Sequence, residues 1–110
     1  MKKLPLLLFM VLYSISLYSQ SSNNALILFD AFSKDTTLTK GWGFSSLIEY
    51  NGKRILFDAG SNADLFKKNV LRLGVDLKKI DFVVVSHAHY DHLNGIDYLL
   101  SINPAVKIYF

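Results

Sequence analysis

Apolar and polar positions follow two different periods along the chain, and the alternation of these periods predicts a mixed α/β fold. Short apolar runs bounded by turn residues predict strands at residues 25–31, 44–50, 54–57, 82–86 and 106–110. Apolar residues at helical spacing predict one helix that begins at the capping residue Asn62 and ends before Gly74. A second, shorter helix is predicted over about residues 94–101. This order of elements predicts helices packed on a mixed sheet.

Turn residues sharpen this prediction. Asn51-Gly52 separates two apolar runs by two residues that accept positive φ, which indicates a β-hairpin. A polar, flexible loop over residues 33–43 ends in Gly41-Trp42-Gly43. Trp42 has two interpretations, as a wall of a ligand cleft or as a ring packed in the core.

The first twenty residues have the layout of a secretory signal peptide. A basic start, Met1-Lys2-Lys3, precedes an apolar stretch from Leu4 to Leu12, and a small, polar segment follows. The stretch is too short and too interrupted for a typical spanning helix. We therefore expect export to the periplasm or the medium, with cleavage near Ser19-Gln20 and no stable membrane association afterwards. An uncleaved anchor and a buried helix are the alternatives.

Composition excludes several classes of function. The 110 residues contain no cysteine, so no disulfide framework or thiolate ligand is available. The formal net charge is +3, and without Lys2 and Lys3 it is +1. Such a weak charge, with no basic stripe carrying aromatic residues, predicts no nucleic-acid partner. The chain length allows one modest domain.

All three histidines of the chain lie within six residues, at the end of the apolar run Phe82–Val85. His87 and His89 are two positions apart, so in extended backbone their side chains leave on the same side, roughly 7 Å apart. Asp91 and His92 follow where the strand gives way to a polar turn. Imidazole with carboxylate is the ligand mix of zinc, iron and manganese enzymes. A hydrogen-bonded structural role is the alternative, but packing alone does not explain so dense a cluster of polar rings.

The segment Ser86-His87-Ala88-His89-Tyr90-Asp91-His92 resembles the HxHxDH signature of the metallo-β-lactamase superfamily. Residues 44–60 and 73–82 are similar to its dihydropterin–ribofuranosylaminobenzene phosphate synthase-like branch. The resemblance covers nearly all of the chain from about Ala25. It implies that residues 21–110 form the N-terminal part of a four-layer αββα sandwich. The chain ends within an apolar strand, which predicts a longer protein.

The same resemblance implies roles for individual residues. His87 and His89 would bind a first divalent metal ion, and Asp91 and His92 a second, with zinc the first choice and manganese or iron as alternatives. Asp91 would also orient the nucleophile. Asp58 matches an aspartate that orients the metal loop, as a carboxylate does when it accepts the free ring N–H of a ligand. The alternative for Asp58 is a plain turn residue. The remaining ligands of both ions are expected beyond Phe110.

These observations predict an exported metallo-hydrolase. A metal-bound hydroxide would attack a small-molecule ester, lactone, β-lactam or phosphoester. The pterin chemistry of the branch takes place in the cytoplasm. It is not expected for this protein, because it conflicts with a signal peptide. One alternative is an iron-dependent redox enzyme of the same fold. Another is a non-catalytic exported binding domain or an inactive fragment. The sequence leaves the substrate and the oligomeric state open.

Overall fold

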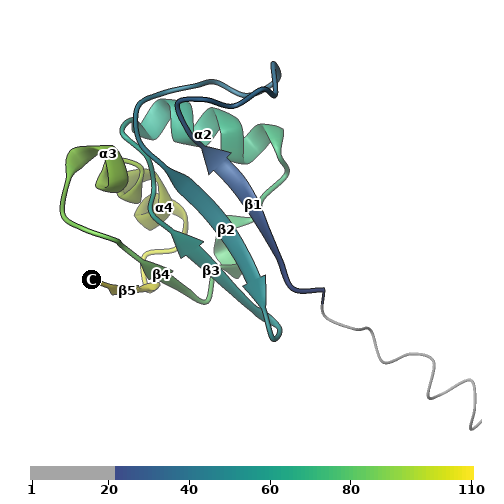
Figure 1. The fold of residues 1–110 in the computed structure, drawn as a ribbon. Coiled ribbons are helices and arrows are strands. Elements are labelled where there is room, and N and C mark those ends of the chain that lie inside the picture. The colour runs from purple at the N-terminus through teal and green to yellow at the C-terminus, as the bar shows by residue number, and fades with distance from the viewer. Residues whose placement is uncertain (1–21) are drawn as a thin grey trace, which may run out of the picture.

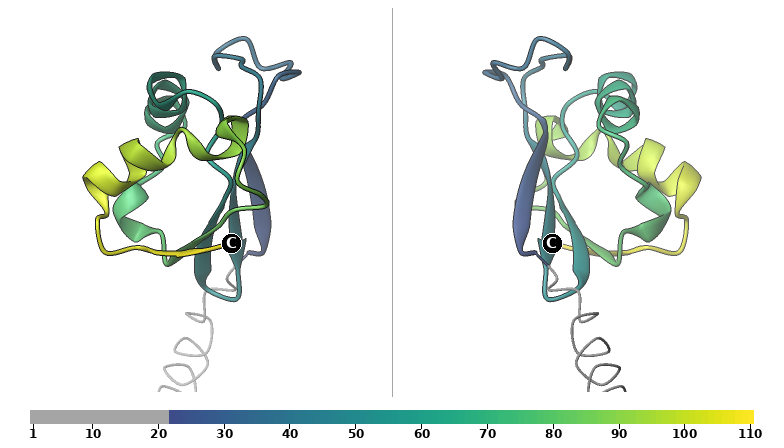
Figure 2. Two further views of the ribbon diagram at one scale, coloured as in Figure 1. Left: turned by 90° about the vertical axis from the view of Figure 1, so that its left-hand side faces the viewer. Right: turned by 90° about the vertical axis from the view of Figure 1, so that its right-hand side faces the viewer.

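A computed structural model describes residues 22–110, which form one five-stranded sheet with helices on one side (Figures 1 and 2). The strand order is β1-β2-β3-β4-β5, which follows the chain. β1, β2 and β3 are antiparallel, whereas β3, β4 and β5 are parallel, so the predicted mixed sheet is confirmed. The bounds of the strands are β1 (Asn24–Phe29), β2 (Ser45–Tyr50), β3 (Lys53–Phe57), β4 (Phe82–Val84) and β5 (Lys107–Tyr109). The segment interpreted as a signal peptide lies outside the described residues.

The helical elements are short, and residues at both ends of α2 explain where that helix begins and ends. Their bounds are α2 (Ala63–Arg72), the 3-10 turn η1 (Leu77–Lys79), α3 (Tyr90–Leu93) and α4 (Ile96–Ile102). The side chain of Asn62 accepts hydrogen bonds from the first turn of α2, and Gly74 follows the helix with a φ of 67°. In the hairpin turn Asn51 and Gly52 have φ values of 47° and 75°, as the sequence predicts. Among the described residues, no helix is long and apolar enough to cross a membrane.

The core lies between the sheet and the helices. One row of apolar side chains runs across all five strands in register, through Leu26, Leu47, Leu56, Val83 and Ile108. The three central members of this row are buried with Phe66 and Val70 of α2 and with Leu99 of α4. Burial of each such side chain contributes about 1.5–3 kcal/mol. This core fixes α2 and α4 against the sheet and so positions the connections at its edge.

The other face of the sheet is also apolar, and no element among residues 22–110 covers it (Figure 2). Alternation along the strands places on that face Ile27, Ile48, Ile55, Phe57, Phe82, Val84 and Tyr109. The described residues therefore comprise one sheet and one layer of helices. This architecture is a mixed α/β fold, and the four-layer sandwich stays a prediction.

Two predicted elements that flank the histidines differ from the structure. The strand predicted at residues 82–86 ends at Val84, and the helix predicted over residues 94–101 is preceded by the separate helix α3. α3 and α4 are separated at Gly95, which packs so closely that a Cβ there would overlap the carbonyl oxygen of Ala59. Polar residues around the histidines suggested a turn, but Tyr90–Leu93 close one helical turn of their own. The histidine segment therefore starts in a bend and ends in a helix.

Candidate metal centre

The parallel pairing of β3 and β4 brings two connections to one edge of the sheet. Asp58 directly follows β3, and Ser86 stands two residues after the end of β4. The segment from His87 to His92 continues from there into α3. Residues 34 positions apart in the sequence thus become neighbours.

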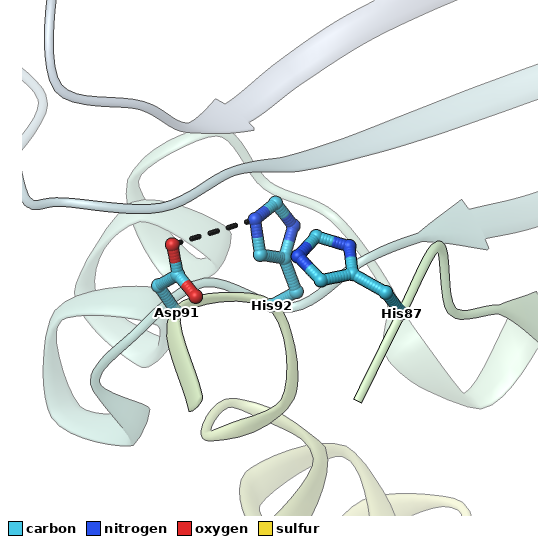
Figure 3. Close-up of side chains that lie close together, drawn as sticks. All are labelled: His87, Asp91 and His92. Atoms are coloured by element: carbon cyan, nitrogen blue, oxygen red, sulfur yellow. Dashed lines mark ion pairs between the residues drawn. The ribbon is translucent and has the colours of Figure 1, made fainter. Parts of the chain in front are cut away.

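Three side chains of this segment converge, as Figure 3 shows. One potential ligand atom from each of His87, Asp91 and His92 lies within 4.8 Å of the others. The two imidazole rings have centroids 4.2 Å apart, and Nε2 of His92 lies 3.5 Å from Oδ2 of Asp91. Ligand atoms about 2.0–2.2 Å from one zinc ion are at most about 4.4 Å apart, so small side-chain rotations bring all three within coordination distance. Two imidazoles and a carboxylate are a donor set that fits a divalent metal ion.

His89 does not belong to that group. Its ring centroid is 4.6 Å from that of His87, and the two rings are nearly perpendicular, at 86°. The prediction of extended backbone through His87 and His89 is wrong, because the strand has already ended and the N–H of His89 donates to the carbonyl oxygen of His87 at 3.0 Å. The structure thus brings His87 close to Asp91 and His92, and the division of the four ligands into two pairs stays a prediction.

Asp58 is buried, with only 1% of its surface exposed, and its carboxylate accepts three hydrogen bonds. Oδ1 accepts the backbone N–H of Ser86 at 2.7 Å, and Oδ2 accepts the Ser86 hydroxyl at 2.7 Å. Oδ2 also lies 2.7 Å from Nδ1 of His92. The backbone of Asp58 has a φ of 55°, a left-handed conformation that Asp and Asn tolerate better than most residues. Its carboxylate thereby connects the ends of β3 and β4 with the candidate ligands.

These hydrogen bonds define which ring nitrogens remain free. An ionised carboxylate only accepts, so in a neutral His92 ring Nδ1 carries the proton and Nε2 keeps the lone pair. The single hydroxyl proton of Ser86 is donated to Asp58, so the Ser86 oxygen accepts from Nδ1 of His87 at 2.8 Å. Nε2 of His87 is then also free. One buried carboxylate sets the tautomers of both rings, directly for His92 and through Ser86 for His87.

Backbone hydrogen bonds hold α3 against the turn after β3. The N–H of Ala59 donates to the carbonyl oxygen of His92 at 2.8 Å, and the N–H of Asn94 donates to that of Gly60 at 3.1 Å. On the other side, the N–H of Phe44 donates to the carbonyl oxygen of Asp91 at 3.3 Å. The ligand-bearing helix is therefore fixed by two segments distant in sequence, the turn after β3 and the residue before β2.

A pocket of about 310 Å³ opens beside the cluster. It is lined by Asp91 and His92 together with residues of the loop between β1 and β2: Asp30, Ala31, Phe32, Trp42, Gly43 and Phe44. Trp42 is 63% exposed, so its side chain forms a wall of this pocket and is not packed in the core. In the same loop, hydrogen bonds from the hydroxyl and the N–H of Thr37 hold the pKa of Asp35 below its ordinary value.

Sequence reasoning missed one residue that shapes this region. Asn69 of α2 is 2% exposed, and its amide makes three hydrogen bonds to backbone atoms of β1 and the loop. The sequence does indicate its burial, because Asn69 stands between Phe66 and Val70 on the apolar face of α2. A polar side chain at such a position needs buried partners.

Residues 38–110 match the family model of the metallo-beta-lactamase superfamily. The chain belongs to this superfamily. Over 58 residues it is 52% identical to an uncharacterized protein of Methanocaldococcus jannaschii, covering 53% of this chain and 22% of that protein. The 7,8-dihydropterin-6-methyl-4-(beta-D-ribofuranosyl)-aminobenzene-5'-phosphate synthase of the same organism is 36% identical, covering 63% of this chain and 24% of the relative. The predicted resemblance to the superfamily and to this branch is confirmed.

A further relative and a solved structure widen the comparison. Ribonuclease Z of Bradyrhizobium diazoefficiens is 40% identical, covering 50% of this chain and 17% of the enzyme. The subclass B3 metallo-beta-lactamase BJP-1 of Bradyrhizobium japonicum superposes with a TM-score of 0.55 at 20% identity. That match covers 81% of this chain and 31% of BJP-1, and at this identity it shows a shared fold. The chain thus spans about a quarter or less of the length of the three curated relatives.

Proposed function

We propose that this protein is a metal-dependent hydrolase whose reacting centre is built on His87, Asp91 and His92. One observation carries the proposal: their potential ligand atoms lie within 4.8 Å of one another. The hydrogen bonds of Asp58 and Ser86 support it, because they leave Nε2 free on both imidazoles. Membership of a superfamily that consists mostly of hydrolases points the same way.

Each residue has a definite task in this proposal. His87, Asp91 and His92 hold a divalent ion, zinc by preference, and Asp58 keeps both rings in the tautomer that binds it. When bound, such an ion makes hydroxide available near neutral pH and polarises the oxygen of the group to be cleaved. The Asp91 carboxylate lies at the pocket, where it can also accept a hydrogen bond from the attacking water and orient it.

A second metal ion is part of the proposal. His89 lies edge-on to His87, and rotation of its ring would present a nitrogen to an ion adjacent to the first. The residues that complete both sites would come from outside the present chain. We expect about two metal equivalents in the full-length protein, as in two-metal hydrolases.

Metal analysis tests the site directly. The full-length protein is stripped with a chelator, loaded with zinc, desalted and measured by elemental analysis. His87→Ala and His92→Ala should each abolish tight binding of the first ion, whereas His89→Ala should lose only the second. Lys67→Ala, an exposed change on α2, is the control and should retain the full content. Equal metal content in His92→Ala and Lys67→Ala would contradict the site assignment.

Activity assays address the substrate class. We propose a small-molecule ester, lactone, β-lactam or phosphoester. The ribonuclease Z relative keeps an RNA phosphodiester open, so the predicted absence of a nucleic-acid partner is not supported. Chromogenic reporters of each class and a short RNA should be offered to zinc-, manganese- and iron-loaded protein. Hydrolysis that disappears in His92→Ala supports the proposal. Oxygen-dependent turnover with iron alone would favour a redox enzyme, and no turnover with any metal would favour a binding domain.

Two further proposals concern the rest of the protein. We propose that residues 1–20 direct export, which the N-terminal sequence of the secreted or periplasmic protein tests.

We also propose that a second sheet covers the apolar face containing Ile48, Phe57 and Phe82, completing the four-layer sandwich. Contiguous apolar surface on a soluble protein is usually covered by another element or a partner. Hydrogen exchange on full-length protein should show protection of β2 and β3 consistent with coverage on both faces.

A further inference from the structure

Asparagine followed by glycine occurs twice in the chain, at Asn51-Gly52 and at Asn94-Gly95. This dipeptide is chemically labile, because glycine has no side chain to shield its backbone nitrogen from the side-chain amide before it. Attack of that nitrogen on Cγ of the asparagine expels ammonia and closes a succinimide ring. Asparagine is therefore among the thermolabile residues of proteins. The fold gives the two copies of the dipeptide very different surroundings.

Asn51-Gly52 forms the turn at the free end of the hairpin of β2 and β3, where Tyr50 and Lys53 are exposed as well (Figure 1). A Cβ added at Gly52 would meet nothing within 4 Å, so the space around the attacking nitrogen is open. The backbone N–H of Asn51 donates to Oδ1 of Asn23 at 3.0 Å, a bond that involves neither reacting group. Among residues 22–110, the Asn51 side chain and the Gly52 N–H make no hydrogen bond.

Asn94-Gly95 is held between α3 and α4. Nδ2 of Asn94 donates to the carbonyl oxygen of Ser61 at 2.9 Å, and the N–H of Asn94 donates to that of Gly60 at 3.1 Å. Gly95 is buried, and its backbone packs so closely that a Cβ would overlap the carbonyl oxygen of Ala59. Both the side-chain amide and the backbone of this copy are therefore fixed.

Each turn must open before a ring can close, and the cost of opening separates the two copies. In the ring the glycine nitrogen eclipses Cβ of the asparagine, a torsion far from the helical ψ of −20° at Asn94 and from a tight hairpin turn at Asn51. Opening the hairpin turn disturbs only the exposed end of the ladder between β2 and β3, and such fraying costs little free energy. Opening at Asn94 separates α3 from the turn after β3 and costs much more.

We propose that Asn51 is a site of spontaneous deamidation, whereas Asn94 is protected by the fold. The Gly52 nitrogen forms a bond to Cγ of Asn51, and the side-chain nitrogen leaves as ammonia. Water then opens the succinimide. Addition of water at Cγ gives aspartate, and addition at the main-chain carbonyl carbon gives isoaspartate. The reaction consumes water and releases ammonia, with no oxidant or metal, so it is independent of the proposed hydrolase function.

The two products affect the turn differently. Aspartate keeps the backbone unchanged and tolerates a positive φ as asparagine does. Isoaspartate adds a carbon atom to the backbone of a two-residue turn, whose length sets the pairing of Tyr50 with Lys53. Each product also adds a negative charge. Because the turn lies at the opposite end of β3 from Asp58, we expect modified protein to lose stability in the hairpin and to retain its metal centre.

Peptide mapping by mass spectrometry tests the proposal. Full-length protein is incubated in mildly alkaline buffer, either native or in urea, and digested with trypsin. Asn51 then lies in the peptide of residues 41–53 and Asn94 in that of residues 80–107. In native protein we expect deamidation of Asn51 to be at least about tenfold faster than that of Asn94. In urea, where both turns are unfolded, the two rates should agree within about threefold. Asn51→Gln, whose longer side chain closes a ring slowly, is the control and should leave the first peptide unmodified.

Two outcomes overturn the proposal. The first is an equal or faster rate at Asn94 in native protein. The second is a tenfold difference that persists in urea, because the neighbouring sequence and not the fold would then be its cause. Modified protein separated by anion exchange should bind zinc with the affinity of unmodified protein. A large loss of zinc affinity would contradict the separation of this turn from the metal centre.

Discussion

Oδ2 of Asp58 lies 2.7 Å from Nδ1 of His92, although the two residues are 34 positions apart and only one of them is in the metal-ligand cluster. The contact exists because β3 and β4 are paired in parallel and end at the same edge of the sheet. A buried carboxylate without a histidine partner would lose one of three hydrogen bonds. A histidine without the carboxylate would lose the group that selects its tautomer.

Asp58→Asn should therefore weaken metal binding more than it weakens the fold. Asn tolerates the left-handed backbone at this position, so the turn is retained. The amide cannot accept from all three donors as the carboxylate does, and we expect metal affinity to fall about 10–100-fold. Competition against a chelating dye measures the affinity, and thermal unfolding followed by circular dichroism monitors the fold. Asp97→Asn, an exposed change in α4, is the control, and equal affinity in the two variants would contradict the role of Asp58.

The Ser86 hydroxyl should also be needed for tight metal binding, because it connects Asp58 to the ring of His87. It donates to Asp58 and accepts from Nδ1 of His87. In Ser86→Ala the His87 ring loses its partner, and we expect about a tenfold loss of metal affinity. Ser86→Thr keeps the hydroxyl and should restore most of the affinity. Ser101→Ala, which removes an exposed hydroxyl bonded only to the Tyr98 carbonyl, serves as the comparison. Equal metal affinity in Ser86→Ala and Ser101→Ala would exclude this role of the Ser86 hydroxyl.

Asn69→Ala should destabilise the protein and loosen the loop. It leaves a buried backbone group of Leu28 and partly buried backbone groups of Thr39 without their partners. The expected decrease in the free energy of unfolding is about 2–4 kcal/mol. Urea titration measures it, with Asn24→Ala as the control because the Asn24 side chain bonds at the surface. Quenching of Trp42 by acrylamide at a temperature where the variant is still folded should increase if Asn69 positions the loop. Unchanged quenching would limit Asn69 to a role in stability.

A matched pair of glycine substitutions separates backbone strain from crowding at the site. Gly43 and Gly52 both have positive φ, at 121° and 75°. A Cβ at Gly43 would overlap the carbonyl oxygen of Asp91, whereas one at Gly52 would meet nothing within 4 Å. Gly52→Ala should cost about 1–2 kcal/mol of stability and leave metal affinity unchanged. Gly43→Ala should cost more stability than Gly52→Ala. It should also reduce metal affinity, because Asp91 must move to make room for the Cβ. Isothermal titration with zinc would show this difference, and identical zinc affinity in the two variants would argue against it.

Sequence patterns predicted the parts of the fold that depend on neighbours in the chain. Asn51-Gly52, the Asn62 cap and Gly74 are such cases, since local conformation alone makes each element begin or end there. The density of ligand-type residues likewise predicted a metal centre. The grouping of His87 with Asp91 and His92 was not predictable, because α3 forms where polar composition indicated a turn. The burial of Asn69 depends on a loop thirty residues away in the chain, which no local pattern contains.

The parallel pairing of β3 and β4 also determines when the centre forms. Parallel neighbours need a crossover, here through α2 and η1, so Asp58 meets His92 only after that whole connection has closed. Contacts between residues so distant in sequence form slowly during folding. The hairpin of β2 and β3 and the helix α2 can assemble earlier without them. High-affinity metal capture is therefore a late event in folding, and an ion bound before it would be held by single, mobile histidines.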